Sequence, residues 1–394
     1  MKVALVWELG QDLGHLSAFQ PLAEELLARG HEVSLIARDV TRVASMFGGV
    51  PVRILQAPVS GFVQKNRSWT ASHAEILLAS HYGEPGVLAC LVEAWRHLFA
   101  LLEPNVIVCD HAPAAMLAAA SLRIPVAIYS IGFCAPVPDR PPVDLCPWMN
   151  SGEERIQASE HRFLTALNEV AGTQGVAPLK HVSDLYRVAL TFIQGFAEFD
   201  PYHADRRQAY YTGPIKSEIP RLEPSWGDKG RNRIFAYLKP RFSQTLDLLS
   251  ELAKLDADVL CYCPGLDTGH TLAKNLHILS EPVRMSSVLE SADLVVCHGG
   301  PGTMLTGLLA GCPVIAVPTQ LEQTHNAMTL HKLGLGTYIA PSQVNMTADY
   351  ASQVLDSQTV KFRVKEFANR YRSFDQKRSV TFICDRIEEL KLAR

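Results

Sequence analysis

The sequence has no long apolar run. A helix needs about 18 to 20 consecutive apolar residues to cross a membrane, and the best candidate, near residues 112–131, is broken by Arg123 and Pro125. We therefore expect no transmembrane segment, whereas peripheral contact with a membrane stays open. The first eight residues, MKVALVWE, carry an acid too early for a secretory signal peptide, and we expect them to begin with a strand.

An excess of charge is also lacking. The 394 residues carry a formal net charge of −3, and 20% of them are charged. Because there is no basic surplus, nucleic acid is not an expected partner, and because no block of like charges occurs, no charged tail is expected. A chain of this length is too long for a single compact core, so we expect two domains.

The cysteines form no repeating framework. They are nine, an odd number, and several lie inside apolar runs. This usage predicts reduced, buried thiols and a cytoplasmic protein. Cys261 and Cys263 share one face of a predicted strand, but no second cysteine pair or histidine pair lies near them in the sequence. We therefore expect no metal site.

One stretch organises the second half of the chain, residues 293–327, which read DLVVCHGGPGTMLTGLLAGCPVIAVPTQLEQTHNA. Residues 293–297 are short, apolar and rich in β-branched side chains, as in a strand buried on both faces of a parallel sheet. The glycines that follow permit a tight turn, and Thr303 is expected to cap a helix over residues 304–310. Residues 314–317 are expected to form the next strand.

The turn after residue 297 has the chemistry of a phosphate site. A helix N-terminus presents amide donors and the positive end of the helix dipole to one place. The backbone of Gly299, Gly300 and Gly302, together with the side chains of His298 and Thr303, supplies the candidate donors. An ordinary Rossmann turn with an incidental histidine is the alternative.

Glu322 and Gln323 follow the next predicted strand. They are expected at the carboxyl edge of the sheet, where open α/β sheets bind ligands. A carboxylate beside a carboxamide offers acceptors and donors together, which suits the hydroxyl groups of a sugar. Both residues are therefore candidate sugar contacts.

His15 and Asp110 are candidates at the same edge of a first sheet. The first half opens with a strand over residues 2–7, a loop over 8–13, a helix over 18–28 and a strand over 31–37, the order of half a Rossmann unit. His15 lies between that loop and that helix, and a buried strand over residues 104–110 ends at Asp110. For both residues, capping the following helix is the alternative role.

The remaining elements are predicted from the spacing of apolar residues and from the positions of proline and glycine. Residues 132–150 are predicted to form a loop, and the polar, proline- and glycine-rich residues 205–229 a linker. We expect helices over residues 90–102, 159–171 and 360–392, and strands over residues 125–130, 188–192 and 233–238.

The spacing H-G-G-x-G-T from His298, then A-G-x-P, then P-x-x-x-E-Q-x-x-N-A resembles the nucleotide-sugar signature of the UDP-glycosyltransferase-like enzymes. The G-H at His15, followed by a helix and R-G-H-x-V, resembles the first loop of the same family. The resemblance implies the GT-B fold, an α/β fold of two Rossmann-like domains facing across a cleft. The implied parts are an acceptor-binding domain over 1–205, a linker over 206–229, a nucleotide-sugar-binding domain over 230–370 and a C-terminal helix over 371–394 that packs back on the first domain.

The resemblance also implies roles for single residues. His15 falls on the family's general base and Asp110 on its partner, which accepts the second N–H of the imidazole and fixes the tautomer. The turn from His298 to Thr303 falls on the diphosphate site, and Glu322 with Gln323 on the sugar site. The implied nucleoside contacts are Pro282, Val283, Met285 and Thr306.

The sequence departs from the family pattern in three places, at residues 239–240, 282 and 306. Lys239 and Pro240 stand where most members have a Gly-Ser or Gly-Thr turn that touches the diphosphate, and Lys239 either supplies a positive charge there or is an ordinary surface lysine. Pro282 stands where a tryptophan often stacks on the base. Thr306 stands where plant members bind the ribose with a glutamate, so the choice between UDP and dTDP stays open.

The implied activity is inverting transfer of a hexose from a UDP- or dTDP-sugar to a hydroxyl of a small-molecule or lipid-like acceptor. No cofactor and no metal are expected, because the nucleotide sugar is a substrate and a helix terminus takes the part of a cation. One alternative is a non-catalytic GT-B protein that binds nucleotide or assists a partner. The other is a sugar-nucleotide epimerase, which would need further acids that no motif here supplies. The acceptor, the sugar and the oligomeric state stay open.

Overall fold

The computed structural model describes residues 1–10, 14–60, 69–217, 223, 226–227, 231–239, 242–266, 273–279 and 281–392. Residues 11–13 of the predicted first loop, Pro240, and most of the predicted linker beyond residue 217 lie outside the described residues. The chain divides into two compact units, residues 1–217 with 375–394, and residues 218–374. Residues 206–217, which we expected in the linker, belong to the first unit.

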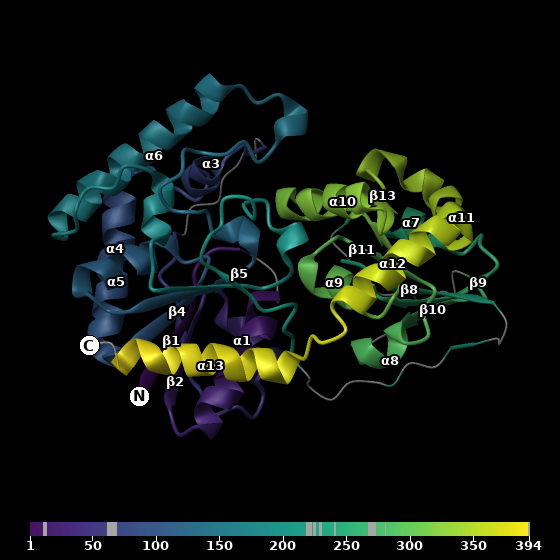
Figure 1. The fold of residues 1–394 in the computed structure, drawn as a ribbon, viewed down its shortest axis with the longest axis horizontal. Coiled ribbons are helices and arrows are strands. Elements are labelled where there is room, and N and C mark those ends of the chain that lie inside the picture. The colour runs from purple at the N-terminus through teal and green to yellow at the C-terminus, as the bar shows by residue number, and fades with distance from the viewer. Residues whose placement is uncertain are drawn as a thin grey trace. The chain divides into compact units, whose positions relative to one another are not determined.

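A parallel sheet of seven strands forms the centre of the first unit (Figure 1), in the order β3-β2-β1-β4-β5-β6-β7. The strands are β1 (Lys2–Trp7), β2 (Glu32–Ala37), β3 (Arg53–Gln56), β4 (Val106–Asp110), β5 (Val126–Ser130), β6 (Leu190–Ile193) and β7 (Tyr210–Tyr211). The strand order reverses between β1 and β4. Open α/β sheets bind ligands outside the carboxyl ends of the strands at such a point.

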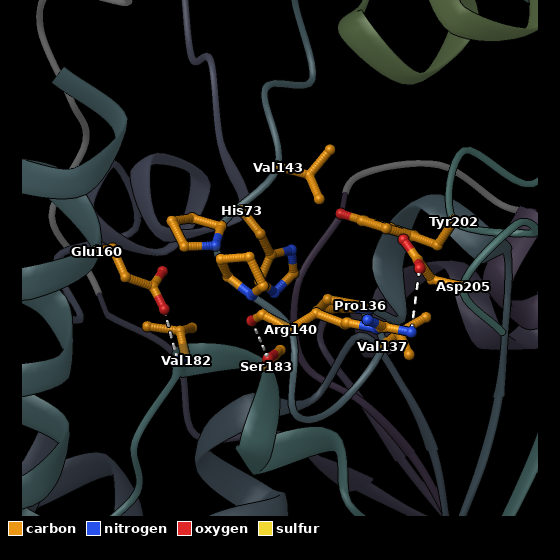
Figure 2. A pocket seen from close by; sticks show the side chains of 12 residues that line it. His73, Pro136, Val137, Arg140, Val143, Glu160, Val182, Ser183, Tyr202 and Asp205 are labelled. Atoms are coloured by element: carbon orange, nitrogen blue, oxygen red, sulfur yellow. Dashed lines mark hydrogen bonds and ion pairs between the residues drawn. The ribbon is translucent and has the colours of Figure 1, made fainter. Parts of the chain in front are cut away.

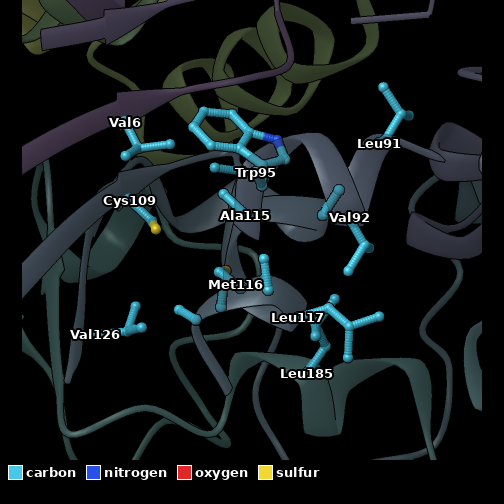
Figure 3. Packing of buried hydrophobic residues seen from close by; sticks show 14 of the residues in the cluster. Val6, Leu91, Val92, Trp95, Cys109, Ala115, Met116, Leu117, Val126 and Leu185 are labelled. Atoms are coloured by element: carbon cyan, nitrogen blue, oxygen red, sulfur yellow. The ribbon is translucent and has the colours of Figure 1, made fainter. Parts of the chain in front are cut away.

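Helices pack on both faces of this sheet, and alternate residues of β1 divide between two apolar cores. Ala4 and Val6 join the core that contains α4, α5 and α6, whereas Leu5 and Trp7 join the core that contains α1 and α13. Figure 3 shows Val6 in the first of these cores. The helices of this unit are α1 (Gly14–Ala28), α2 (Val43–Phe47), α3 (His73–Leu78), α4 (Pro85–Leu102), α5 (Pro113–Leu122), α6 (Glu153–Thr173) and α13 (Gln376–Leu392), with short 3₁₀ turns η1 (Val40–Arg42), η2 (Gly132–Cys134), η3 (Pro147–Met149), η4 (Val182–Tyr186) and η5 (Ala197–Phe199).

Among the described residues, α4 is the one helix long and apolar enough to cross a membrane by length and composition. One of its faces is buried in the first core: Leu88, Leu91, Val92, Trp95, Phe99 and Leu102. Figure 3 shows three of them beside α5. The apolar character of that face is accounted for by packing.

Two helices begin where the sequence did not predict. α1 starts four residues before the predicted helix, so His15 lies in its first turn; apolar periodicity cannot mark a start at Gly14 and His15. The predicted helical segment over residues 360–392 consists of two helices, because α12 ends at Arg370 and α13 starts at Gln376. The Asp375 carboxylate accepts a hydrogen bond from the Arg378 amide at 2.8 Å, and a capping side chain of this kind starts a new helix. α13 then packs against α1 in the first unit (Figure 1).

The second unit has a parallel sheet of six strands in the order β10-β9-β8-β11-β12-β13. Its strand order reverses between β8 and β11. The α/β class with two parallel-sheet domains is therefore confirmed. The elements are β8 (Asn232–Tyr237), α7 (Thr245–Leu252), β9 (Ala257–Tyr262), β10 (Leu276–Leu279), α8 (Met285–Leu289), β11 (Leu294–Cys297), α9 (Pro301–Leu309), β12 (Val314–Ala316), α10 (Leu321–Leu333), β13 (Gly336–Tyr338), η6 (Pro341–Met346), α11 (Thr347–Asp356) and α12 (Gln358–Arg370).

Candidate functional site

His15 and Asp110 meet at the carboxyl edge of the first sheet. Nδ1 of His15, in the first turn of α1, lies 2.6 Å from Oδ2 of Asp110, the last residue of β4. The second carboxylate oxygen, Oδ1, accepts a hydrogen bond from the Ser130 hydroxyl at 2.5 Å. Both carboxylate oxygens therefore have a partner, and the carboxylate is almost fully buried. Ser130 was not among the predicted site residues, although it lies at the end of β5, next to β4.

Trp7 and Gly10 fix the position of the His15 ring. The ring centroids of Trp7 and His15 are 5.1 Å apart, and the ring planes are inclined by 19°, which is a stacked pair. Gly10 has a φ of +99°, and a Cβ there would lie 2.4 Å from Nε2 of His15. Residue 10 must therefore be glycine for the imidazole to take this place. Trp7 also pairs with Asp110 in the register of β1 and β4.

Glu8, whose carboxyl group is buried, directly follows β1 at the same carboxyl edge of the sheet. Its Oε1 accepts a hydrogen bond from the Tyr82 hydroxyl at 2.5 Å, and its Oε2 accepts hydrogen bonds from the amides of Ala114 and Ala115 in the first turn of α5. Burial raises the pKa of Glu8 to about 7, although these hydrogen bonds act in the opposite direction. The carboxyl group thus links β1, the segment after α3 and the start of α5.

Two buried histidines lie beside this edge. His111 directly follows Asp110, and its ring centroid is 6.1 Å from that of His73 in α3. Burial lowers the pKa of His73 to about 3. Burial also lowers the pKa of His111 to about 3, with a smaller contribution from the imidazoles of His73 and His15. Both rings are therefore neutral near pH 7.

His73 also lines a pocket in the first unit (Figure 2), whose volume is about 430 Å³ with its open mouth included. The segment over residues 136–143 forms one wall, and α6 and η4 contribute Glu160 and Val182. Figure 2 shows Glu160 and Tyr202 on opposite sides of His73. A loop was predicted over residues 132–150, but none of the residues that line this pocket was predicted as a site residue.

In the second unit, the glycine turn joins β11 to α9 as predicted, with one difference at Thr303. The helix begins at Pro301 with Gly300 as its N-cap, so Thr303 is the third helical residue and does not cap the helix. The reason is that proline at the first helical position is already set to a helical φ. The first bond inside the helix runs from the Met304 amide to the Gly300 carbonyl at 3.2 Å. The amides of Gly302 and Thr303 precede that bond.

His298 holds two backbone segments together. Its Nδ1 lies 2.8 Å from the Val317 carbonyl oxygen and donates to it, and its Nε2 accepts a hydrogen bond from the Lys239 amide at 3.0 Å. In this arrangement the one N–H of the neutral ring is used by Val317, so donation from His298 to a phosphate stays a prediction. The bond also brings the backbone of Lys239, just after β8, to the turn that starts α9.

Gly299 brings the turn against α10. Its φ is +80°, and a Cβ at this position would lie 3.1 Å from the Gln323 carbonyl oxygen. The Gly299 carbonyl accepts a hydrogen bond from Nδ2 of Asn326 at 2.9 Å. The Gly299 amide donates to Sγ of Cys297, with a nitrogen to sulfur distance of 3.4 Å.

Glu322 and Gln323 lie in the first turn of α10, after β12. Glu322 accepts a hydrogen bond from Asn326 at 2.7 Å. The carboxamide oxygen of Gln323 accepts hydrogen bonds from the amide of Thr319 at 2.9 Å and from its hydroxyl at 3.0 Å. Both predicted sugar contacts thus stand at the carboxyl edge of the sheet and are held by neighbours.

The four predicted nucleoside contacts lie on two neighbouring helices and the segment before them. Pro282 and Met285 are half-buried at the start of α8, and Thr306 is half-buried on α9, which contacts α8. The side chain of Val283 is buried, so only its backbone can reach a ligand. The Thr306 hydroxyl donates to the Gly302 carbonyl at 2.7 Å.

Comparison with known proteins agrees with this arrangement. Residues 246–383 match the family described as erythromycin biosynthesis protein CIII-like, C-terminal domain. A zeaxanthin glucosyltransferase of Pseudescherichia vulneris is 26% identical over an alignment of 383 positions, which covers 89% of this chain and 89% of the other. The TDP-daunosamine transferase DnrS of Streptomyces peucetius is 31% identical over an alignment of 165 positions, which covers 37% of this chain and 36% of the other.

The solved structure of CalG4, the calicheamicin glycosyltransferase, has the same fold. The two chains align with a TM-score of 0.77 over 99% of this chain and 98% of the other, at 18% identity. The sequence motifs, the matching family, the relatives and the fold agree with one another. These findings support a UDP-glycosyltransferase-like protein, an enzyme that is similar to glycosyltransferases and has the GT-B fold.

Proposed function

We propose that this enzyme transfers a hexose from a UDP- or dTDP-sugar to a hydroxyl of a small-molecule or lipid-like acceptor, with inversion at the anomeric carbon. The observation that carries the proposal is the pair formed by His15 and Asp110, whose side chains are 2.6 Å apart. A buried carboxylate that accepts Nδ1–H leaves the lone pair of the imidazole on Nε2. Nε2 is then the base.

His15 accepts the proton of the acceptor hydroxyl as that oxygen attacks the anomeric carbon. The new bond joins the acceptor oxygen to the anomeric carbon, and the bond from that carbon to the diphosphate oxygen breaks. The diphosphate leaves with the electron pair, and Asp110 stabilises the imidazolium that forms. A general base of this kind contributes about 10² to 10⁴ in rate.

The second unit binds the donor in this proposal. The departing diphosphate gains negative charge, which the amides of Gly302 and Thr303 and the dipole of α9 stabilise. The side chain of Lys239 adds a positive charge. The turn at Gly300 brings the backbone close to the phosphates. Because these groups take the part of a cation, the reaction uses no metal, and it needs no cofactor.

Glu322 and Gln323 bind the hydroxyl groups of the sugar. The carboxamide oxygen of Gln323 is used by Thr319, so the carboxamide nitrogen is the donor to the sugar. Pro282, Met285, Thr306 and the backbone of Val283 contact the nucleoside. The relative DnrS is named for a TDP-sugar, which supports dTDP beside UDP as the donor nucleotide.

The test is a screen of the purified protein. We expect UDP or dTDP to raise the melting temperature more than GDP does, and a matching nucleoside diphosphate sugar to add one sugar residue to the mass of a hydroxyl-bearing acceptor from a pool. The coupling constant of the anomeric proton in the product reports inversion, and a chelator should leave the rate unchanged. Nucleotide binding without product from any donor and acceptor would instead support a non-catalytic binding protein.

A further inference from the structure

Trp7 places its aromatic face against the imidazole of His15. It is the last residue of β1, and its side chain is fully buried in the core that contains α1 and α13. Its Nε1 donates a hydrogen bond to the Leu9 carbonyl oxygen at 2.7 Å, which fixes the plane of the indole. The ring centroids of Trp7 and His15 are 5.1 Å apart, and the planes are inclined by 19°. The indole therefore covers one face of the imidazole.

This contact differs in geometry from the one that Asp110 makes. Asp110 meets the imidazole at its edge, with Oδ2 at 2.6 Å from Nδ1 of His15. An aromatic face carries partial negative charge, and it attracts a cation that lies within about 6 Å of its centre. The imidazolium form of His15 carries a full positive charge, whereas the neutral ring carries none. Trp7 therefore interacts more strongly with the protonated ring than with the neutral one.

Burial of both rings strengthens the attraction. The side chain of His15 is 17% exposed, and that of Trp7 is fully buried, so little water is present to screen the charge. Tryptophan also attracts a cation more strongly than tyrosine or phenylalanine does. The indole is thus the aromatic side chain that can favour the imidazolium most.

The titratable groups near His15 do not replace this effect. The carboxylate of Asp110 favours the imidazolium from the ring edge. The imidazole of His111, which also interacts with His15, is neutral near pH 7, because burial lowers its pKa to about 3. It therefore adds no positive charge beside the base.

The charged groups on the neighbouring strands are held by other partners. Both oxygens of the Glu8 carboxyl group accept hydrogen bonds, from the Tyr82 hydroxyl and from amides of α5. Arg38, which follows β2, donates from Nη1 to the backbone carbonyl of Glu8 at 3.0 Å. A change in the indole of Trp7 alone leaves all of these groups in the protein.

We infer that Trp7 is a positioning residue of the reaction, whose indole face stabilises the imidazolium form of His15 and so makes His15 a stronger base. This inference rests on the proposed function, because the base that Trp7 strengthens is the base of that transfer. Trp7 itself takes no proton. A tryptophan that only filled the core would hold the imidazole in place and leave its proton affinity unchanged.

Fluorinated tryptophan tests the inference with little change of shape. Three fluorine atoms on the benzene ring of the indole withdraw charge from its face, so its attraction for a cation weakens. All five tryptophans are replaced, no donor or acceptor is present, and the pKa of His15 is read from its ring resonances in an NMR titration. His15→Gln identifies those resonances. We expect the pKa to fall by about half a unit, and an unchanged pKa would overturn the inference.

Trp7→Phe supplies the matched control for fluorination. In this variant a phenyl ring that carries no fluorine stands against His15, while the other four tryptophans are still replaced. Fluorination should then leave the pKa of His15 unchanged. A shift as large as in the wild type would show that the effect comes from other tryptophans, and it would contradict the assignment.

Substitutions extend the comparison to ordinary protein. The pKa of His15 should fall from the wild type to Trp7→Phe and again to Trp7→Leu, which should lie about one unit below the wild type. Trp95→Leu is the control, because Trp95 is equally buried but lies in the other core (Figure 3); it should leave this pKa unchanged. Equal shifts in Trp7→Leu and Trp95→Leu would overturn the inference. If Trp7→Leu does not fold, the fluorinated protein decides.

The pH profile of transfer separates base strength from placement of the ring. A base of lower pKa stays unprotonated at lower pH, so the acid limb of kcat/KM in Trp7→Phe should move to lower pH by the amount seen in the titration. The weaker base should also lower kcat on the plateau by about threefold or less, with the KM of the donor unchanged. A misplaced ring would lower the rate equally at every pH and leave the limb in place, which would contradict the inference.

The outcome is distinct from that of the proposed function. If fluorination lowers the pKa of His15 and no donor supports transfer, the role of the indole stands and the transferase mechanism fails. If transfer occurs and fluorination leaves this pKa unchanged, the mechanism stands and this inference fails.

Discussion

Asp110 holds His15 through one short hydrogen bond, with Nδ1 of the imidazole 2.6 Å from Oδ2 of the carboxylate. The same carboxylate is held from its other side by the hydroxyl of Ser130. A carboxylate held at both oxygens cannot rotate, so it orients the ring and sets which nitrogen carries the proton. The catalytic proposal depends on this relationship.

Asp110→Asn should lower kcat about 10² to 10⁴-fold. The amide nitrogen of asparagine can donate to Nδ1, which moves the ring proton to Nε2 and removes the base. Donor affinity should be unchanged, because the substitution lies in the first unit. Steady-state kinetics with a donor titration measures both quantities.

Ser130→Ala is the matched control for that experiment, since it removes one orienting bond and keeps the carboxylate. We expect a loss of about tenfold or less. A kcat in Asp110→Asn within twofold of the wild type would show that the tautomer of His15 is not set by Asp110.

Gly299→Ala should destabilise the second unit by about 1 to 2 kcal/mol and weaken donor binding. The added Cβ meets the Gln323 carbonyl oxygen at 3.1 Å, at a φ of +80° that alanine rarely adopts. Gly300→Ala is the control, because Gly300 has a φ of −62° and open space around its Cβ position. Chemical denaturation should separate the two variants, and equal stability of both would contradict the packing described for the turn.

Glu8 should make stability depend on pH. Its pKa is about 7 in the folded protein, against an ordinary value of 4.5, so the folded state keeps a proton that the unfolded state releases. The contribution of Glu8 to the free energy of unfolding is therefore fully present below about pH 4.5. It is lost as the pH rises to about 7, and the total loss is about 3 kcal/mol. Above pH 7 it should not change further.

Glu8→Gln, which resembles the protonated acid, isolates this effect. His73 and His111 have lowered pKa values and oppose it, because the unfolded state binds their protons as the pH falls below about 6.5. The difference in free energy of unfolding between wild type and variant cancels the histidines. As the pH rises from 4.5 to 7, the variant should become more stable relative to the wild type. A difference that does not change with pH would mean that Glu8 is ionised in the folded protein.

Ile387→Ala should destabilise the first unit by about 2 to 5 kcal/mol. Ile387 lies on α13 and is fully buried in the core shared with α1. Glu389→Ala, on the exposed face of the same helix, should change stability by less than about 1 kcal/mol. If the two variants unfold at the same denaturant concentration, α13 does not hold the first unit together.

Much of the fold could be predicted because buried parallel strands appear in the sequence as short apolar runs. β1, β4, β5 and β11 appear within two residues of their predicted bounds, since each is flanked by glycine, proline or polar residues. Helix starts were less predictable. Gly14 and Gln376 begin helices without an apolar signal, and the cap at Asp375 could have revealed the second of these.

The candidate site was only partly predictable. His15 and Asp110 could be placed at one edge because His15 follows β1 and Asp110 ends β4, two strands of one parallel sheet. The rotation of a side chain is set by contacts that sequence spacing does not contain, so the bonds of His298 to the backbone of Val317 and Lys239 were not predicted. The contacts of Ser130 and Glu8 were not predicted for the same reason.

The most direct test of the central claim is the single-turnover rate of sugar transfer by His15→Ala, with the dissociation constant of the donor measured on the same preparation. We predict a rate lower by about 10² to 10⁴-fold, an unchanged dissociation constant, and partial recovery of the rate on addition of imidazole. A rate within twofold of the wild type, with the donor bound as before, would contradict the assignment of His15 as the base.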